Sequence, residues 1–355
     1  FIYDRKGTLL VENIVQRDLY VTPAYIEDYP TTLLQLSNLL NVPYELLEEN
    51  FARSKKKINK FDSFPLVKAL NEEQIAKAKV NLDLIPGIEV KATLKRYALH
   101  KETLAHILGY VGDISSDEIK RDKLLVELQN TQIGKTGIEK EYDLILRGKP
   151  GIQTQERDVK GKLVRVLDTQ GAEDGQDIFL TIDQKLQDHL FKLFENRRGA
   201  LVALEPKTGL VRALISSPSF NPNILNSIVD VDEVESLFSN KESPIFNRAI
   251  SGQYPPASTL KPFVGLAAIE NKVISWDKKI KDNGKFYVEG DPRPYRGWKE
   301  NGHGRVDMRK AIAESSDVYF YTIAFDLTLS GIRPMLDSFG FGKKTGLTDF
   351  EANGL

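Results

Sequence analysis

The chain has 355 residues, of which 41% are hydrophobic and 28% are charged, a balance typical of a globular protein long enough for two domains. Its 49 Lys and Arg residues nearly equal its 50 Asp and Glu residues, so no excess of positive charge indicates a nucleic-acid partner. The absence of cysteine excludes disulfides, thiolate catalysis and Cys-containing zinc sites.

Both ends of the chain suggest that it belongs to a longer sequence. It begins at Phe1 rather than at an initiator Met, and no signal peptide is visible. No apolar run reaches the roughly 18 residues that span a bilayer. An anchor could therefore precede Phe1.

The first half of the chain predicts a mixed helix and strand domain. F-I-Y-D-R-K-G-T-L-L-V indicates a strand, a turn at Lys6-Gly7 and a second strand. From Thr22 to about Ser54, leucines at helical spacing predict two helices with a break at Val42-Pro43. Further elements are predicted in order: a helix over 71–80, a strand over 88–94 and a helix around 101–108.

A change in composition predicts the domain boundary. G-A-E-D-G, residues 171–175, is polar and turn-rich, so we place a first domain over 1–170 and a second over 171–355. The second domain opens with the strand D-I-F-L-T-I and a helix over 184–194. The runs G-A-L-V-A-L-E-P and L-V-R-A-L-I-S-S then predict an antiparallel hairpin with its turn at Lys207-Thr208-Gly209.

The stretch Y-P-P-A-S-T-L-K-P-F places a hydroxyl at Ser258 and an amine at Lys261. Pro262 is tolerated in a first helical turn, so we predict a helix from near Ser258 to about Glu270. Residues three apart share a helix face, so the Lys261 amine can reach the Ser258 oxygen and act as its base. The alternative is an N-cap serine followed by a surface lysine.

The S-x-x-K pattern alone does not decide between these readings, because it also occurs at Ser54 to Lys57 and at Ser275 to Lys278. The serine at 258 differs from the other two because it heads an apolar helix, where a lysine is desolvated. Of the three patterns, Ser258 and Lys261 are therefore the candidates for a nucleophile and its base, and the capping alternative stays open at this point.

A second polar signal interrupts the apolar stretch A-I-A-E-S-S-D-V-Y-F-Y. Ser315, Ser316 and Asp317 there need hydrogen-bond partners if they are buried. They are candidates for a catalytic site, with a simple helix N-cap as the alternative.

These motifs resemble the penicillin-binding transpeptidases, whose signature is S-x-x-K, then S-x-N or S-D-N, then K-T-G. Y-P-P-A-S-T-L-K-P, together with L-T-I-D-Q-K-L-Q and G-A-L-V-A-L-E-P-K-T-G upstream, is similar to class B penicillin-binding proteins. The D-R-K-G opening is typical of their N-terminal pedestal domain, and R-G-W-K-E-N-G-H-G points to the elongation type, the penicillin-binding protein 2 group. The resemblance implies an α+β protein in which a mixed pedestal (dimerisation-type) domain precedes a transpeptidase domain, an antiparallel sheet with helices on both sides that is incomplete in this chain.

The resemblance also implies roles for the site residues. Ser258 would be the acylated nucleophile, Lys261 its base, and Ser315 a proton relay. Asp317 would stand where many relatives have Asn, and an ionised Asp accepts hydrogen bonds but donates none.

The third motif of the family is not found at a suitable place. K-T-G occurs at 135–137, 207–209 and 344–346, whereas the resemblance implies an edge strand well beyond the second motif. We interpret the first as part of the pedestal domain and the other two as turns. The third motif is expected to lie outside this chain.

No metal and no cofactor is predicted. Some relatives of the elongation type carry zinc near the second motif, bound by Asp, His and Cys. Here His303 is present, but Gly297 stands where an Asp is expected and no cysteine exists. The remaining histidines share no ligand spacing: His100, His106 and His189.

Taken together, the motifs favour a serine D,D-transpeptidase that cross-links peptidoglycan stem peptides and is a target of β-lactam antibiotics. One alternative is a carboxypeptidase or β-lactamase on the same fold, and another is a non-catalytic penicillin-binding scaffold. The resemblance further implies a periplasmic domain anchored in the inner membrane by an N-terminal helix. Its expected partners are a polymerising glycosyltransferase of the SEDS family and the elongation machinery, with no nucleic acid.

Overall fold

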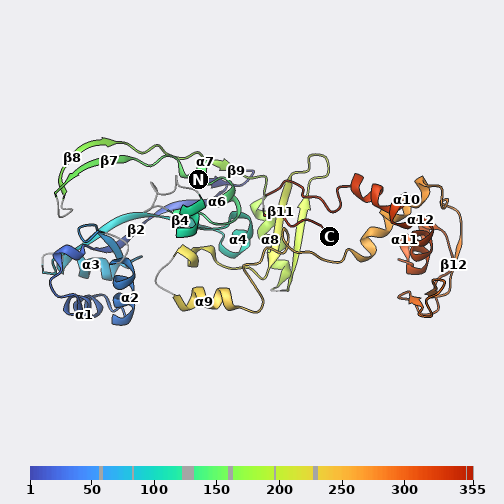
Figure 1. Cartoon of the computed structure of the whole chain (residues 1–355), viewed down its shortest axis with the longest axis horizontal. Coiled ribbons are helices and arrows are strands. Elements are labelled where there is room, and N and C mark those ends of the chain that lie inside the picture. Colours follow the sequence, from blue (N-terminus) through green and yellow to red (C-terminus); the bar gives the residue numbers. More distant parts are fainter. Residues whose placement is uncertain are drawn as a thin grey trace. The chain divides into compact units, whose positions relative to one another are not determined.

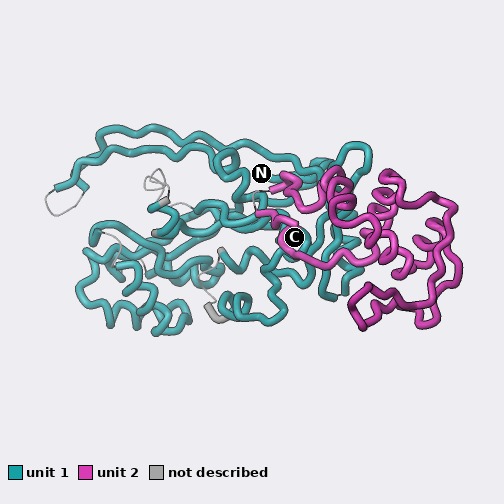
Figure 2. Tube along the Cα trace, turned by 45° about the vertical axis from the view of Figure 1, so that its right-hand side comes forward, with its two compact units in different colours: residues 1–249 teal, residues 250–355 magenta. Residues whose placement is uncertain are grey.

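The computed structural model describes residues 1–55, 59–81, 84–121, 132–158, 163–195, 197–226, 231–348 and 350–354. These residues form two compact units, Phe1–Ala249 and Ile250–Leu355, which are coloured separately in Figure 2. Helices and mainly antiparallel strands alternate irregularly along the chain, as the predicted α+β class requires.

The first unit is built on one long strand, β2 (Leu9–Val21). One edge of β2 pairs along its length with β4 (Ile88–Ala98), and the other edge pairs with β1 (Ile2–Tyr3) and β3 (Phe64–Val67). All these pairs are antiparallel, whereas β9 (Ile178–Phe179) joins β1 in parallel. The predicted opening of strand, turn and strand is therefore confirmed, and the second strand is longer than its sequence pattern indicated.

Helices cover one end of this sheet. α1 (Tyr29–Leu40), α2 (Tyr44–Lys55) and α3 (Glu72–Asn81) lie together beside β2 (Figure 1). The predicted break between the first two helices is confirmed, because Asn41 ends α1 in the left-handed conformation, with φ of 53°. Leucines on the inner faces of these helices pack with β2 and β3 into the largest core of the unit: Leu33, Leu36, Leu40 and Leu47.

The predicted helices around 101–108 and over 184–194 are observed as α4 (Lys101–Leu108) and α8 (Gln184–Phe194). The predicted hairpin consists of β10 (Gly199–Leu204) and β11 (Val211–Ser217), and α8 packs against β11. The hairpin and α8 belong to the predicted sheet with helices on both sides, and they lie in the first unit.

A two-stranded ribbon was not predicted. β7 (Ile152–Arg157) and β8 (Leu163–Gln170) pair antiparallel, and every residue of β8 is exposed. The other short elements of this unit are η1 (Pro23–Tyr25), β5 (Val111–Asp113), α5 (Ser116–Arg121), β6 (Gln132–Gly134), α6 (Gly137–Glu141), α7 (Asp143–Arg147), η3 (Pro222–Asn226) and α9 (Val231–Ser239).

The described part of residues 171–249 packs within the first unit. The Asn223 amide donates to Ala98 O and accepts from Ala98 N, both at 2.9 Å. The Gln187 amide bonds the backbone N and O of Leu214 in the same way, at 2.9 and 2.7 Å. These contacts place residues 171–249 in the same compact unit as the first half of the chain, so the units divide between 249 and 250. The predicted domain boundary at 170/171 is a different division, and it remains a prediction.

The second unit is a helical layer with short strand pairs. α10 (Lys261–Glu270) packs against α12 (Asp317–Ser338), with α11 (Met308–Ala313) beside both. Its core is apolar: Ala267, Ala268, Val306, Met308, Tyr319, Phe320 and Ile323. The unit is completed by a 3-10 turn and by two antiparallel pairs: η4 (Ala257–Leu260), β12 (Ile280–Asp282) with β15 (Gly304–Val306), and β13 (Lys285–Phe286) with β14 (Tyr295–Arg296).

Candidate active site

Ser258 lies in the 3-10 turn η4, which continues directly into α10. Lys261 N donates to Ser258 O across this junction, and Pro262 follows as the second residue of α10, where its missing N–H leaves no acceptor unpaired. The predicted helical segment from Ser258 to Glu270 is confirmed. Ser258 itself is exposed, so its hydroxyl is open to a ligand.

Ser315, Ser316 and Asp317 form the junction between α11 and α12. Ser316 is the N-cap of α12, and its hydroxyl accepts from Tyr319 N at 3.3 Å. Ser315 has φ of 51°, a left-handed conformation that costs a non-glycine residue free energy. The capping alternative thus describes Ser316, and it leaves the side chains of Ser315 and Asp317 available to other partners.

Lys261 meets both of those side chains. Its Nζ donates to Ser315 Oγ at 3.0 Å, to Ser315 O at 2.9 Å and to Asp317 Oδ1 at 2.6 Å. Ser315 Oγ in turn donates to Ser258 Oγ at 2.8 Å. The Lys261 side chain is only 12% exposed, so its charge is largely screened from water and is neutralised by Asp317.

The structure therefore brings together all of the predicted site residues, Ser258, Lys261, Ser315 and Asp317. The expected direct contact between Lys261 and Ser258 is replaced by a contact through Ser315. The physical reason is that Ser315 O, Ser315 Oγ and Asp317 take the hydrogens of the Lys261 ammonium.

Asp317 has a second partner that the sequence did not indicate. Its Oδ2 accepts from Trp298 N at 3.0 Å, and the Trp298 indole N–H donates to Glu314 O at 3.2 Å. Both carboxylate oxygens of Asp317 thus accept from donors. An Asn at this position would have to turn its amide hydrogens toward one of those donors, which explains why Asp suits this loop.

The other S-x-x-K patterns do not build a comparable site. Ser275 is an exposed turn residue after α10 whose carbonyl accepts from Lys278 N at 3.2 Å. Ser54 lies on α2, and Lys57 lies outside the described residues.

The K-T-G triplets at 135–137, 207–209 and 344–346 lie outside the strands. The first leads into α6, with Lys135 paired to Glu118 at 2.6 Å, and the second is the turn between β10 and β11. In the third, Thr345 N and Gly346 N donate to the Glu351 carboxylate at 2.8 and 3.1 Å. The interpretation of the second and third triplets as turns is confirmed.

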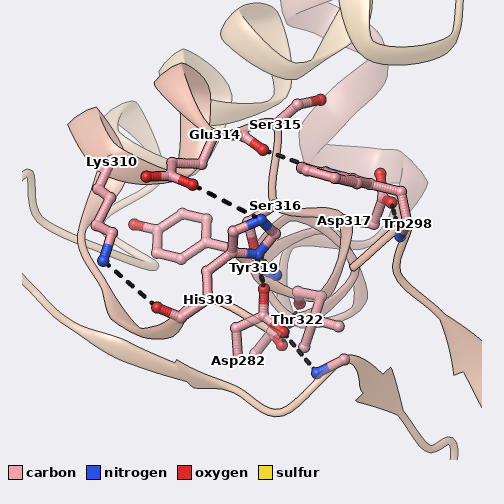
Figure 3. Close-up of polar contacts among 12 residues, drawn as sticks. Asp282, Trp298, His303, Lys310, Glu314, Ser315, Ser316, Asp317, Tyr319 and Thr322 are labelled. Atoms are coloured by element: carbon pink, nitrogen blue, oxygen red, sulfur yellow. Dashed lines mark hydrogen bonds and ion pairs between the residues drawn. The ribbon is translucent and has the colours of Figure 1, made fainter. Parts of the chain in front are cut away.

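Behind the second-motif loop, Asp282 and His303 form a buried pair that the sequence did not link. His303 Nδ1 lies 2.7 Å from Asp282 Oδ2, and Ser316 Oγ donates to the same oxygen at 2.6 Å (Figure 3). Gly302, with φ of 69°, permits this approach, because a Cβ there would come within 2.2 Å of Asp282 O. The N-G-H-G pattern carries this signal, since it places glycines on both sides of His303.

This pair does not assemble a metal site in the part of the chain that the structure describes, where no three His, Cys, Asp or Glu side chains gather as ligands. The absence of zinc remains a prediction from the sequence. Among the same residues, no helix is long and apolar enough to cross a membrane.

The chain is similar to known penicillin-binding proteins. Residues 1–180 match the penicillin-binding protein dimerisation domain and residues 199–354 match the penicillin-binding protein transpeptidase domain. The peptidoglycan D,D-transpeptidase MrdA of Haemophilus influenzae is 37% identical over 350 residues, which are 98% of this chain and 54% of the relative. MrdA of Acinetobacter baumannii is also 37% identical, over 98% of this chain and 52% of its own length.

The fold is also similar to that of a solved penicillin-binding protein. Penicillin-binding protein 2 of Helicobacter pylori, solved in complex with MreC, matches with a TM-score of 0.83 and 29% identity over 97% of this chain and 64% of that one. The chain spans about half the length of the curated relatives it matches. With a dimerisation domain followed by a transpeptidase domain, and with this similarity to penicillin-binding protein 2, the chain belongs to the penicillin-binding protein family.

Proposed function

We propose that the protein containing this chain is a serine D,D-transpeptidase of peptidoglycan synthesis that is acylated on Ser258. The observation that supports this proposal is the line of hydrogen bonds from Ser258 Oγ through Ser315 Oγ to Lys261 Nζ, at 2.8 and 3.0 Å. It joins an exposed hydroxyl to a largely buried amine, the arrangement that an activated serine nucleophile needs.

In the acylation step, Ser258 Oγ attacks the carbonyl carbon of the D-Ala-D-Ala amide. The Ser258 proton passes to Ser315 Oγ, and the proton of Ser315 passes to Lys261 Nζ in its neutral form. The tetrahedral intermediate then collapses, its C–N bond breaks, and the departing D-Ala amine takes a proton back along the same line. The product is an ester between Ser258 and the shortened stem peptide.

In the second step, an amine of a neighbouring stem peptide attacks the ester carbonyl. The amine loses a proton to the line, the C–O bond breaks, and Ser258 recovers its hydroxyl proton. The net result is one new amide bond and one released D-Ala. No cofactor is needed, because proton transfers alone balance both steps.

Asp317 supports these steps by electrostatics rather than by proton transfer. Its Oδ1 lies 2.6 Å from Lys261 Nζ, so it offsets the charge of Lys261 each time the amine is protonated. Its second oxygen is held by Trp298 N, which fixes the carboxylate between the two donors.

Membership of the family supports a proposal for the setting of the reaction. We propose a periplasmic location, anchored in the inner membrane by a helix that precedes this chain, with β-lactam antibiotics as inhibitors. The structural similarity to a penicillin-binding protein 2 solved with MreC supports a partner of that kind for this protein. A polymerising SEDS-family glycosyltransferase is proposed as the source of glycan strands.

A product assay on the full-length protein tests this proposal against its rivals. With a glycan carrying stem peptides, a transpeptidase yields cross-linked dimers, and Ser258→Ala yields none. Trimmed peptides without dimers would make the protein a carboxypeptidase, and rapid turnover of penicillin would make it a β-lactamase. The absence of any acylation in the wild type would favour a binding scaffold.

A further inference from the structure

The buried pair behind the second-motif loop has no role in the proton transfers described above. We call Asp282, His303 and Ser316 the buried triad (Figure 3). The side chains of Asp282 and His303 are each 2% exposed, and Ser316 is fully buried. Placing an ionisable pair inside a small unit costs free energy unless its hydrogen bonds are made, so the contacts of the triad merit a functional explanation.

Asp282 accepts hydrogen bonds on both oxygens. Its Oδ2 receives Ser316 Oγ and His303 Nδ1, and its Oδ1 receives Gly284 N at 2.7 Å. Burial opposes ionisation of this carboxyl, but the bonds from Ser316, His303 and Gly284 outweigh it and lower its pKa. Since an ionised carboxylate has no hydrogen to donate, His303 carries its proton on Nδ1.

Ser316 transmits this arrangement to the proposed catalytic loop. Its hydroxyl donates to Asp282 and accepts from Tyr319 N, so the residue is held from both sides. Ser315 precedes it directly, in a left-handed conformation that is unfavourable for a non-glycine residue and persists only where neighbours enforce it. Ser316 N also donates to Ala311 O at 2.9 Å, so the bond to Asp282 adds a side-chain anchor to a backbone one. Loss of that side-chain anchor is expected to shift Ser315 Oγ from its place between Ser258 and Lys261.

His303 provides a second path to the same loop. Its ring packs on Trp298, with centroids 5.4 Å apart, and Trp298 N donates to Asp317. On the other side, Lys310 Nζ donates to His303 O at 3.4 Å, and His303 Nε2 lies 3.9 Å from the Glu314 carboxylate. The ring therefore lies between Trp298, which contacts Asp317, and Glu314, which directly precedes Ser315.

We propose that Asp282 and His303 are positioning residues for acylation: through Ser316 they hold Ser315 in the left-handed conformation that places its hydroxyl between Ser258 and Lys261. This inference rests on the proposed function of Ser258. It assigns a kinetic role to two buried side chains that neither contact the substrate nor exchange a proton with it.

The test separates penicillin affinity from the first-order acylation rate by rapid-quench labelling of the full-length protein over a range of penicillin concentrations. Ser316→Ala and Asp282→Asn should slow acylation about tenfold to a hundredfold, the scale of a small misplacement, with affinity unchanged. Asp307→Ala is the control, since Asp307 caps α11 through Lys310 N without contacting the triad. It should lower the melting temperature slightly and leave the acylation rate unchanged.

Two variants of His303 form a matched pair, because each removes the imidazole ring and replaces it with an amide. In His303→Asn the amide nitrogen lies about where Nδ1 lies and can still donate to Asp282. In His303→Gln it extends toward the Nε2 position and cannot. The Asn variant should acylate at least about tenfold faster than the Gln variant, and equal rates would overturn the proposal.

A double variant gives the final criterion. If Asp282 acts through Ser316, then Asp282→Asn with Ser316→Ala should lose no more rate than the more impaired single variant. Losses that multiply, or losses that follow melting temperature in every variant including Asp307→Ala, would contradict the inference. Should Asp282→Asn not fold, Ser316→Ala and the His303 pair decide alone. A wild type that is not labelled on Ser258 would instead refute the proposed function.

Discussion

The change Ser315→Ala removes the middle atom of the proposed proton path. Ser315 Oγ lies 2.8 Å from Ser258 Oγ and 3.0 Å from Lys261 Nζ, and alanine deletes both contacts. The Lys261 amine keeps Ser315 O and Asp317 as partners, so it stays in place. The variant therefore interrupts proton transfer without displacing the nucleophile or the base.

We expect Ser315→Ala to slow acylation strongly and to lower the stability of the fold only slightly. A positioned proton-transfer group contributes roughly a hundredfold to ten-thousandfold, which corresponds to about 3–5 kcal/mol of activation free energy. Two lost hydrogen bonds at a half-buried site cost about 1–3 kcal/mol of folding free energy, and alanine has the same left-handed penalty as serine. We therefore expect a folded protein whose acylation is slowed at least about a hundredfold.

Stopped-flow or rapid-quench labelling with a fluorescent penicillin measures this rate, and thermal unfolding reports the stability of the same sample. Ser275→Ala serves as the control, because Ser275 is the exposed serine of another S-x-x-K pattern and should label at the wild-type rate. Acylation of Ser315→Ala within about tenfold of wild type would refute the path through Ser315 and would require direct transfer from Ser258 to Lys261.

Further predictions concern the base, a buried histidine and the last K-T-G triplet. Lys261→Arg keeps the charge but cannot lose its proton, so acylation should fall at least about a hundredfold, and near-normal labelling would show that the residue supplies charge alone. Burial lowers the pKa of His106 from 6.5 to about 4, so folding favours its neutral form. The stability that this shift contributes is complete above pH 6.5 and is lost as pH falls toward 4. In His106→Gln the melting temperature should depend less on pH across that window. An unchanged dependence of melting temperature on pH would contradict the lowered pKa of His106. Lys344→Ala should acylate normally, because Glu351 occupies the backbone donors of that turn, and a loss beyond about tenfold would make residues 344–346 the working third motif.

Much of the fold could be predicted because it depends on local periodicity. The helices around 101–108 and over 184–194 agree with their predicted bounds: α4 buries Leu104, Ala105 and Leu108 on one face, whereas the fully buried residues of α8 are Gln184 and Gln187. The ribbon of β7 and β8 could not be predicted in this way, because its residues are exposed and lack the alternation of a half-buried strand. The division into units at 249/250 depends on contacts such as Asn223 with Ala98, which are far apart in sequence.

The candidate site could also be predicted only in part, because some of its contacts join residues far apart in sequence. The spacing of Ser258 and Lys261 indicated a shared helix face, and the polar residues before α12 indicated a second component. Spacing could not show that Ser315 lies between Ser258 and Lys261, because that contact depends on the packing of α10 against α12 and on one left-handed residue. The sequence does not indicate a role for Asp282, because a single carboxyl in a turn-rich segment forms no recognisable motif.

Acylation of Ser258 is the step on which the proposed function depends most. Labelling the full-length protein with penicillin, followed by peptide mass spectrometry, tests this directly. We expect the mass of one penicilloyl group on the peptide containing Ser258, and its loss in Ser258→Ala. Label on the peptides of Ser54 or Ser275, or undiminished label in Ser258→Ala, would contradict it.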